Sequence, residues 1–271
     1  MFYSSFILHP LFILSMELRE ILEQLYQRFN RREFVHPDPL ECLYRYDDLR
    51  DREIAALVAS SLASGRVAQI LRSVSMVLEI MQAPHEYLKR ATRETLRRDF
   101  RDFKHRFTTG EELALMLCGV KGLLERYGSL QESFAAGLKR GHETVIPALS
   151  AFVSRLADAA GGAFGPFIPS PVDGSACKRL NLFLRWMVRR DEVDPGGWDN
   201  VPASKLVVPL DIHLHRISLR MKLSERKQKD MRTALEITAA FKTFAPEDPV
   251  RYDFVLTRLG IRNVLWPGGA S

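Results

Sequence analysis

Cysteine is scarce in this sequence of 271 residues, and the few cysteines present are widely separated. Cys42, Cys118 and Cys177 form neither a disulfide framework nor a spacing that holds a metal ion. Three isolated thiols suit a reducing compartment, where each is most simply a small buried apolar side chain. We therefore expect a cytoplasmic protein that carries no metal and no other cofactor.

Long apolar runs are also missing. The most apolar stretch, Met1–Ser15, is too short to span a bilayer and lacks the basic start and Ala-x-Ala site of a signal peptide. Helical spacing of apolar residues begins directly after Met16. We predict no membrane partner, and we interpret residues 1–15 as a disordered tail or as a start site placed too far upstream.

Alternation of apolar and polar residues, the pattern of β-strands, is almost absent. The one short β-like segment, Lys205–Leu210, is interrupted by Pro209. Elsewhere apolar residues recur at spacings of three and four, as in Leu180, Phe183 and Leu184. The sequence therefore predicts an all-α protein, and its length is ample to bury a core.

Two segments rich in glycine and proline, residues 161–174 and 191–202, flank the expected helix that begins near Lys178. That helix is thus presented between two irregular loops. Binding and catalytic residues often occupy such loops, which a rigid framework holds in place.

The net charge of +6 is unevenly distributed. Between Ser175 and Arg232 there are 13 Lys or Arg and 7 Asp or Glu, whereas the rest of the chain balances at 26 against 26. A second basic stretch, Lys89–Arg106, has Phe100, Phe103 and Phe107 within or beside it. Clustered positive charge attracts phosphate groups, so nucleic acid is the expected partner. The alternative for residues 89–106 is a solvated helix face.

Lys178 lies in the first turn of its expected helix if Ser175 is the N-cap. The positive end of the helix dipole and the adjacent Arg179 disfavour a further positive charge there, which favours the neutral amine of a nucleophile. Helical phase places Arg185 and Arg189 on the same side, where they are candidate contacts to nucleic acid. The alternative is that Lys178 is an ordinary solvated surface lysine.

Asp211 follows Pro209 and Leu210 and is an N-cap candidate, accepting from the amide of His213 or Leu214. The same donors favour an ionised carboxylate, which suits a group facing an oxocarbenium ion. An amine and a carboxylate at two helix starts are the groups that cleavage of an N-glycosidic bond requires. Capping alone is the alternative explanation of Asp211.

Several other side chains near these two residues are candidate contacts. Arg216 and Arg220 share a helix face and are expected to contact phosphates. His213 and His215 point to different faces, so they do not form a metal pair, although one of them is a possible phosphate contact. Trp198 is a candidate for stacking on a base.

The segment around Asp211 resembles the aspartate element of the helix-hairpin-helix (HhH-GPD) DNA glycosylase superfamily, "Val/Pro-x-Asp-Thr/x-His-x-x-Arg", which reads Pro209-Leu-Asp211-Ile-His213-Leu-His-Arg216 here. Residues 53–66 are similar to an early helix of that fold that ends near its base pocket. Residues 252–260 resemble its closing helix. Residues 34–40 and 178–189 also resemble an uncharacterised bacterial family.

The sequence departs from most of this superfamily in three ways. The hairpin sequence Leu-Pro-Gly-Val-Gly is missing, and so is the four-cysteine motif, so no iron–sulfur cluster is expected. No lysine stands at the usual shorter distance from the aspartate. The separation of Lys178 from Asp211 is closest to the archaeal 8-oxoguanine glycosylase branch, in which the catalytic lysine lies well upstream.

The resemblance implies two helical lobes with a cleft between them. Residues 51–160 form one lobe, and residues 16–50 with 161–271 form the other, which carries Lys178 and Asp211. A damaged base of duplex DNA, an oxidised purine such as 8-oxoguanine, is flipped into the cleft of a monomeric enzyme. Lys178 attacks C1′ and Asp211 stabilises the positive charge, giving a Schiff base and β-elimination.

The remaining candidate residues are those expected to bind the damaged base or the DNA backbone. The base-pocket candidates are Ser61, Ser64 and Trp198, and the DNA-contact candidates are Arg66, Arg185, Arg189, Arg216 and Arg220. An alternative is a non-catalytic nucleic-acid-binding protein on the same scaffold, which the missing hairpin glycines favour. A helical protein–protein adaptor is a third possibility.

Overall fold

The computed structural model describes residues 10–261, and its regular structure is almost entirely helical, as the sequence predicts. The helices that precede the strands are α1 (Pro10–Phe29), α2 (Leu49–Ser61), α3 (Val67–Met81), α4 (Pro84–Arg90) and α5 (Arg93–Phe100). Those that follow are α6 (Gly110–Tyr127), α7 (Leu130–Ala135), α8 (Ile146–Ala160), α9 (Lys178–Val188), α10 (Ile212–Arg220), α11 (Met231–Phe244) and α12 (Asp253–Ile261).

Strand structure is limited, in the described residues, to one small antiparallel pair and an isolated bridge. Strands β1 (Lys104–His105) and β2 (Thr108–Thr109) form a hairpin that the sequence analysis did not anticipate. The β-like segment from Lys205 to Leu210 is not a strand. It is held instead by side-chain contacts, such as the bond from the Val208 amide to Thr238 Oγ1 (3.1 Å).

The N-terminal segment is helical further upstream than predicted. Helix α1 begins at Pro10, so residues 10–15 are helical here, and the alternative of a start site placed too far upstream stays a prediction. The expectation of disorder for residues 1–9 lies outside the described residues. Along the part of the chain that the structure describes, no helix combines the length and apolar composition needed to cross a bilayer.

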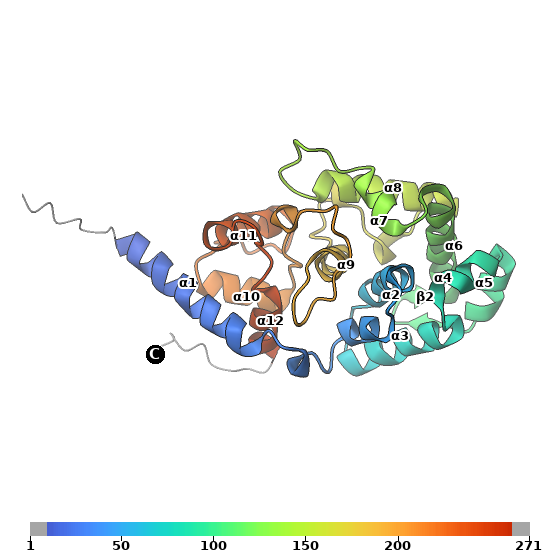
Figure 1. Ribbon diagram of the computed structural model, residues 1–271, viewed down its shortest axis with the longest axis horizontal. Coiled ribbons are helices and arrows are strands. Elements are labelled where there is room, and N and C mark those ends of the chain that lie inside the picture. Colours follow the sequence, from blue (N-terminus) through green and yellow to red (C-terminus); the bar gives the residue numbers. More distant parts are fainter. Residues whose placement is uncertain (1–9, 262–271) are drawn as a thin grey trace, which may run out of the picture.

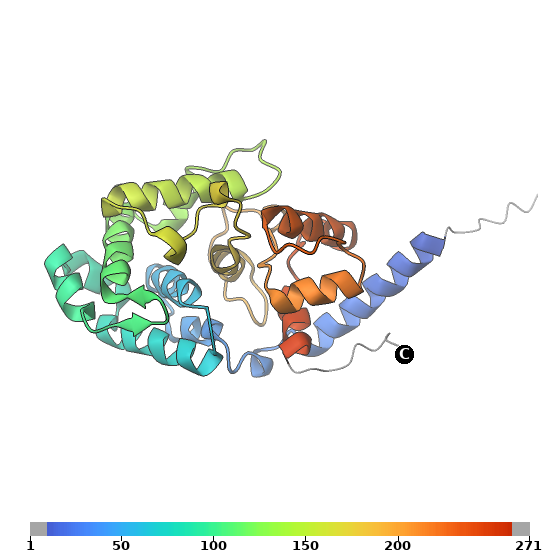
Figure 2. The ribbon, with the colours of Figure 1, turned by 180° about the vertical axis from the view of Figure 1, so that it is seen from behind.

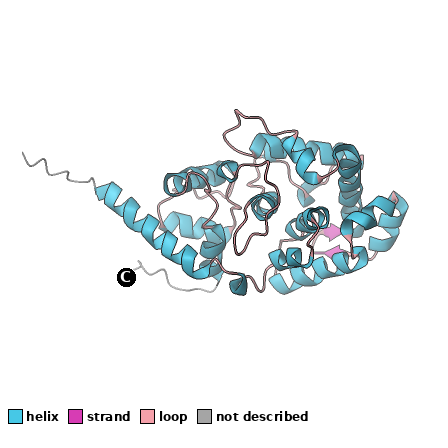
Figure 3. Cartoon of the chain, viewed as in Figure 1, coloured by secondary structure: helices cyan, strands magenta, loops and turns pink. Residues whose placement is uncertain are grey.

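The helices gather in two groups with α9 between them (Figure 1). Helices α1, α10, α11 and α12 make up one group, and α2 to α8 make up the other. Loops surround α9 on both sides, as Figure 3 shows. Helix α9 packs against α2, its Arg185 pairs with Asp253 at the start of α12, and most of its side chains, apolar and polar, are buried.

Helices α6 and α8 illustrate how local sequence sets the packing. Thr109 and Glu112 form a capping box that starts α6, and Gly128, at φ 81°, ends it. A Cβ at Gly119 would lie 2.5 Å from the Leu156 carbonyl oxygen. Glycine is therefore required for the close approach of these two helices.

Glu53 is a buried carboxylate where α2, α7 and the loop after α9 meet. It accepts hydrogen bonds from the amides of Leu130 (2.7 Å) and Gln131 (3.1 Å) and from Trp198 Nε1 (3.1 Å). Burial raises the pKa of Glu53 to about 7, although these three donors oppose the rise. The side chain thus joins three segments that are distant in sequence.

We expect Glu53→Ala to lower the free energy of unfolding by about 3 kcal/mol, because it leaves three buried donors without an acceptor. Because the pKa of Glu53 is raised in the folded protein, the protonation-linked part of its contribution is fully present below pH 4.5 and is lost as the pH rises through about 7. Glu53→Gln should remove this part of the pH dependence. Urea unfolding between pH 4.5 and 8 measures both effects, and an unchanged pH profile for Glu53→Gln would contradict the assignment.

Candidate functional site

Lys178 and Asp211 line one pocket of about 780 Å³, a volume in the range of small-molecule and cofactor sites. The loop between α2 and α3 supplies Ser64 and Gly65, and α12 supplies Asp253 and other residues. The pocket is thus built from both groups of helices. Its walls combine apolar residues with charged ones, and Lys178, Asp211 and Asp253 stand at the starts of α9, α10 and α12.

Lys178 is the first residue of α9, as predicted, but the local geometry differs from the expected cap. The N-cap is Cys177, which is in the left-handed region at φ 46° and makes no side-chain capping bond. The prediction of Ser175 as the N-cap is wrong. Its Oγ accepts from the Cys177 amide (3.2 Å) within the preceding turn. The side chain of Lys178 is 36% exposed, so its amine is accessible from the pocket.

Asp211 caps α10 and faces Lys178 at the same time. Its Oδ1 accepts from the Leu214 amide (2.8 Å), one of the two donors predicted for it. Its Oδ2 lies 3.6 Å from Lys178 Nζ. One carboxylate oxygen is thus fixed by the helix, and the other is left beside the amine. Capping and a role at the site are therefore compatible.

Asp253 is a second acidic group in the pocket wall, and the sequence analysis did not name it as a site residue. Its Oδ2 accepts from Arg185 Nη1 at 2.5 Å. Burial raises the pKa of Asp253 to about 6, with Arg185 opposing the rise and the carboxylate of Asp211 adding to it. The only sequence signal was the position of Asp253 at the start of the segment that resembles a closing helix.

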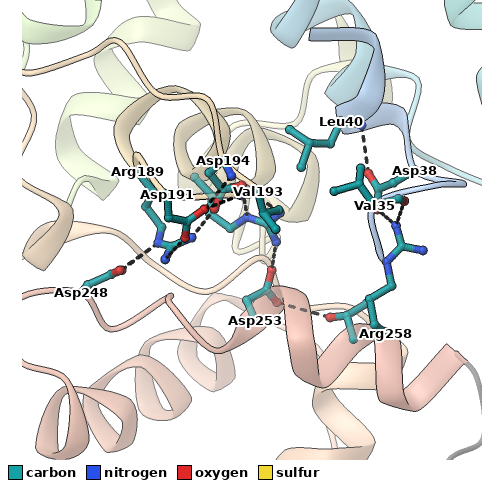
Figure 4. Close-up of polar contacts among 12 residues, drawn as sticks. Val35, Asp38, Leu40, Arg189, Asp191, Val193, Asp194, Asp248, Asp253 and Arg258 are labelled. Carbon is teal, nitrogen blue, oxygen red and sulfur yellow. Dashed lines mark hydrogen bonds and ion pairs between the residues drawn. The ribbon is translucent and has the colours of Figure 1, made fainter. Parts of the chain in front are cut away.

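Arg185 and Arg189 belong to a buried ion cluster with Asp191, Asp194, Asp248 and Asp253 (Figure 4), and Arg185 and Asp253 of this cluster also line the pocket. The two arginines are only 3% and 4% exposed. Their guanidinium groups are already paired with carboxylates inside the protein, which argues against the predicted contacts with nucleic acid.

Two of the three candidates for the base pocket are also misplaced. Trp198 is fully buried and packs against Phe183, with the ring centroids 5.0 Å apart, so it does not line the pocket. Ser61 is buried at the end of α2, where its carbonyl oxygen accepts from Arg179. Ser64 does line the pocket, in the segment predicted to approach it. Trp186, not Trp198, contributes an indole to the wall.

The other basic candidates are on the surface. Arg66, Arg216 and Arg220 are exposed, so their predicted contacts with phosphate stay predictions. His213 lines the pocket, whereas His215 is buried, with Nε2 bonded to the Arg226 carbonyl (2.8 Å).

Arg179 has a positioning role that was not foreseen. Its Nη1 donates to the Ser61 carbonyl (2.8 Å) and its Nη2 to the Pro166 carbonyl (2.5 Å). It thereby ties the start of α9 to the end of α2, next to Ser64. Among the described residues no group of three or more His, Cys, Asp or Glu side chains is arranged to hold a metal ion.

Comparison with known proteins gives a family and nothing beyond it. Searches of curated proteins and of solved structures each found no match to the chain. The model of the family described as "Protein of unknown function (DUF2400)" matches residues 38–262, a span that includes both Lys178 and Asp211. The chain therefore belongs to the DUF2400 family.

Proposed function

We propose that this protein is a DNA glycosylase with β-lyase activity, acting on an oxidised purine such as 8-oxoguanine. The observation that carries the proposal is the approach of Lys178 Nζ to Asp211 Oδ2, 3.6 Å, inside one pocket. The two residues are far apart in the sequence, and the resemblance to HhH-GPD glycosylases selects the same pair. The two groups of helices then act as the two lobes of such an enzyme, with the pocket between them.

The amine of Lys178 forms a bond to C1′ and loses a proton as the C1′–N bond breaks, and the departing base takes the electron pair and a proton. Asp211 stabilises the positive charge that develops on the sugar. The C1′–O4′ bond then opens to give an iminium, C1′=N⁺, with a proton added to O4′. Loss of a C2′ proton expels the 3′ phosphate.

Sodium borohydride trapping with duplex DNA tests this proposal. The duplex carries either 8-oxoguanine or an abasic site, and reduction of the iminium leaves a stable protein–DNA adduct. An adduct on either substrate supports a lysine-dependent lyase, and an adduct with 8-oxoguanine also supports base excision. Salt-dependent binding without an adduct on either substrate would favour the non-catalytic nucleic-acid-binding protein instead.

Asp211→Asn should separate the charge of this residue from its capping role. Asparagine caps a helix about as well as aspartate, so α10 is preserved while the carboxylate facing Lys178 is lost. We expect single-turnover base release to slow by about 10²- to 10³-fold, the effect of losing one electrostatic stabiliser. Asp230, which caps α11 through the Thr233 amide, is the matched control, and Asp230→Asn should leave the rate unchanged. Equal rates for Asp211→Asn and wild type would contradict the assignment.

A further inference from the structure

Phe107 is the most exposed large apolar side chain of the described residues, at 89%. The sequence placed three phenylalanines in or beside the basic stretch, and the structure distinguishes them. Phe100 and Phe103 are buried in the core, at 1% and 6% exposure, and Phe107 is not. An aromatic ring held almost entirely in water is a candidate contact to a partner molecule.

The ring of Phe107 is carried on a fixed support. Phe107 and Arg106 form the two-residue turn between β1 and β2, and Arg106 is in the left-handed region at φ 54°, which residues other than glycine rarely adopt. The strand before the turn is anchored by the buried His105, whose ring nitrogens bond to Ser73 Oγ (2.9 Å) and the Ser64 carbonyl (3.0 Å). Backbone strain at a fixed turn often accompanies a functional site.

The turn lies next to the pocket that holds Lys178. Arg106 Nη1 donates to Ser64 Oγ (2.9 Å), and Ser64 and Gly65 line the pocket. The approach is close, because a Cβ at Gly65 would lie 3.0 Å from Arg106 Cδ. Figure 2 shows the hairpin at the front of its helical group, where it packs against α3 and α6.

At least one cation lies beside the ring. The Arg106 guanidinium lies 5.6 Å from the Phe107 ring centroid, and the exposed Lys104 and Arg66 are nearby in the hairpin and in the loop that it contacts. An exposed aromatic ring among cations fits a nucleobase with its flanking phosphates, because the base stacks while the cations neutralise the backbone. An apolar protein surface would supply no counter-charge for these cations.

We propose that Phe107 stacks on a nucleobase of bound DNA at the mouth of the pocket, adjacent to the nucleotide that enters it. This inference rests on the proposed DNA substrate. Extrusion of a nucleotide leaves a gap in the duplex, and a projecting apolar side chain can fill such a gap between base steps. Ser64, bonded to Arg106 and lining the pocket, links the stacking ring to the site.

The test is the affinity of the full chain for a duplex with a tetrahydrofuran abasic-site analogue, which cannot form an iminium. We expect Phe107→Ala to weaken binding by roughly 10-fold or more, the usual effect of removing one base-stacking ring. Phe107→Trp should retain affinity and add tryptophan emission that DNA quenches. Met76→Ala, which removes another exposed apolar side chain from α3, is the control and should bind as wild type does.

The melting temperature is the control for folding. An exposed ring contributes little to stability, so Phe107→Ala should melt at the wild-type temperature. Equal affinity of Phe107→Ala and wild type would overturn the inference. If wild type still gives a borohydride adduct in that case, the glycosylase proposal stands without it. Weaker binding by Phe107→Ala together with no adduct would support stacking and reject the enzyme.

Discussion

Lys178→Gln should abolish the borohydride adduct and slow strand cleavage at an abasic site by about 10³-fold or more, because glutamine has no amine to attack C1′. DNA affinity should fall by no more than a few-fold. The side chain of Lys178 is 36% exposed, and its nearest carboxylate partner is Asp211, so its replacement leaves no buried group without a partner. Denaturing gel electrophoresis after reduction measures the adduct, and fluorescence anisotropy measures binding.

Lys227→Gln is the matched control for this experiment. Lys227 is exposed in the same basic region, but it does not line the pocket, so the substitution removes an equal charge at a distance from the site. It should leave the adduct intact and change affinity about as much as Lys178→Gln does. An adduct that persists in Lys178→Gln would remove Lys178 from the chemistry and assign the attack to another amine.

The helix starts at Lys178 and Asp211 could be predicted from local sequence, but their pairing could not. Asp211 follows a proline and precedes an apolar-periodic segment, which is the pattern of an N-cap, and it caps α10 as predicted. The distance between two helix starts depends on tertiary packing, which no local pattern encodes. Here the distant resemblance, rather than periodicity, suggested that the two starts meet.

Arg185 and Arg189 show where helical phase and charge counting are misleading. Helical phase correctly places Arg185 away from the apolar stripe of α9, but a helix between two groups of helices has no solvated face. The aspartates that neutralise both arginines come from the following loop, the segment after α11 and the start of α12. Their convergence depends on contacts between residues distant in sequence, and charge counting therefore assigned buried, neutralised arginines to a DNA-binding surface.

Asp194→Ala should lower the free energy of unfolding by about 3–5 kcal/mol. Asp194 is fully buried and pairs with both Arg185 (3.1 Å to Nη2) and Arg189. Removing it leaves two buried guanidinium groups with fewer negative partners in a medium that solvates them poorly. Urea unfolding at pH 7 measures the loss.

Asp248→Ala is the comparison, because it removes one partly exposed ion pair instead of two buried ones. Asp248 also pairs with Arg189 (2.9 Å), but its side chain is 28% exposed, so water can replace it, and the loss should be about 1 kcal/mol. Equal losses of unfolding free energy for the two variants would contradict a dependence on burial.

Asp194→Ala should also slow base release in the fraction that stays folded. Arg185 bridges Asp194 to Asp253 in the pocket wall, and its movement would displace a carboxylate beside Asp211.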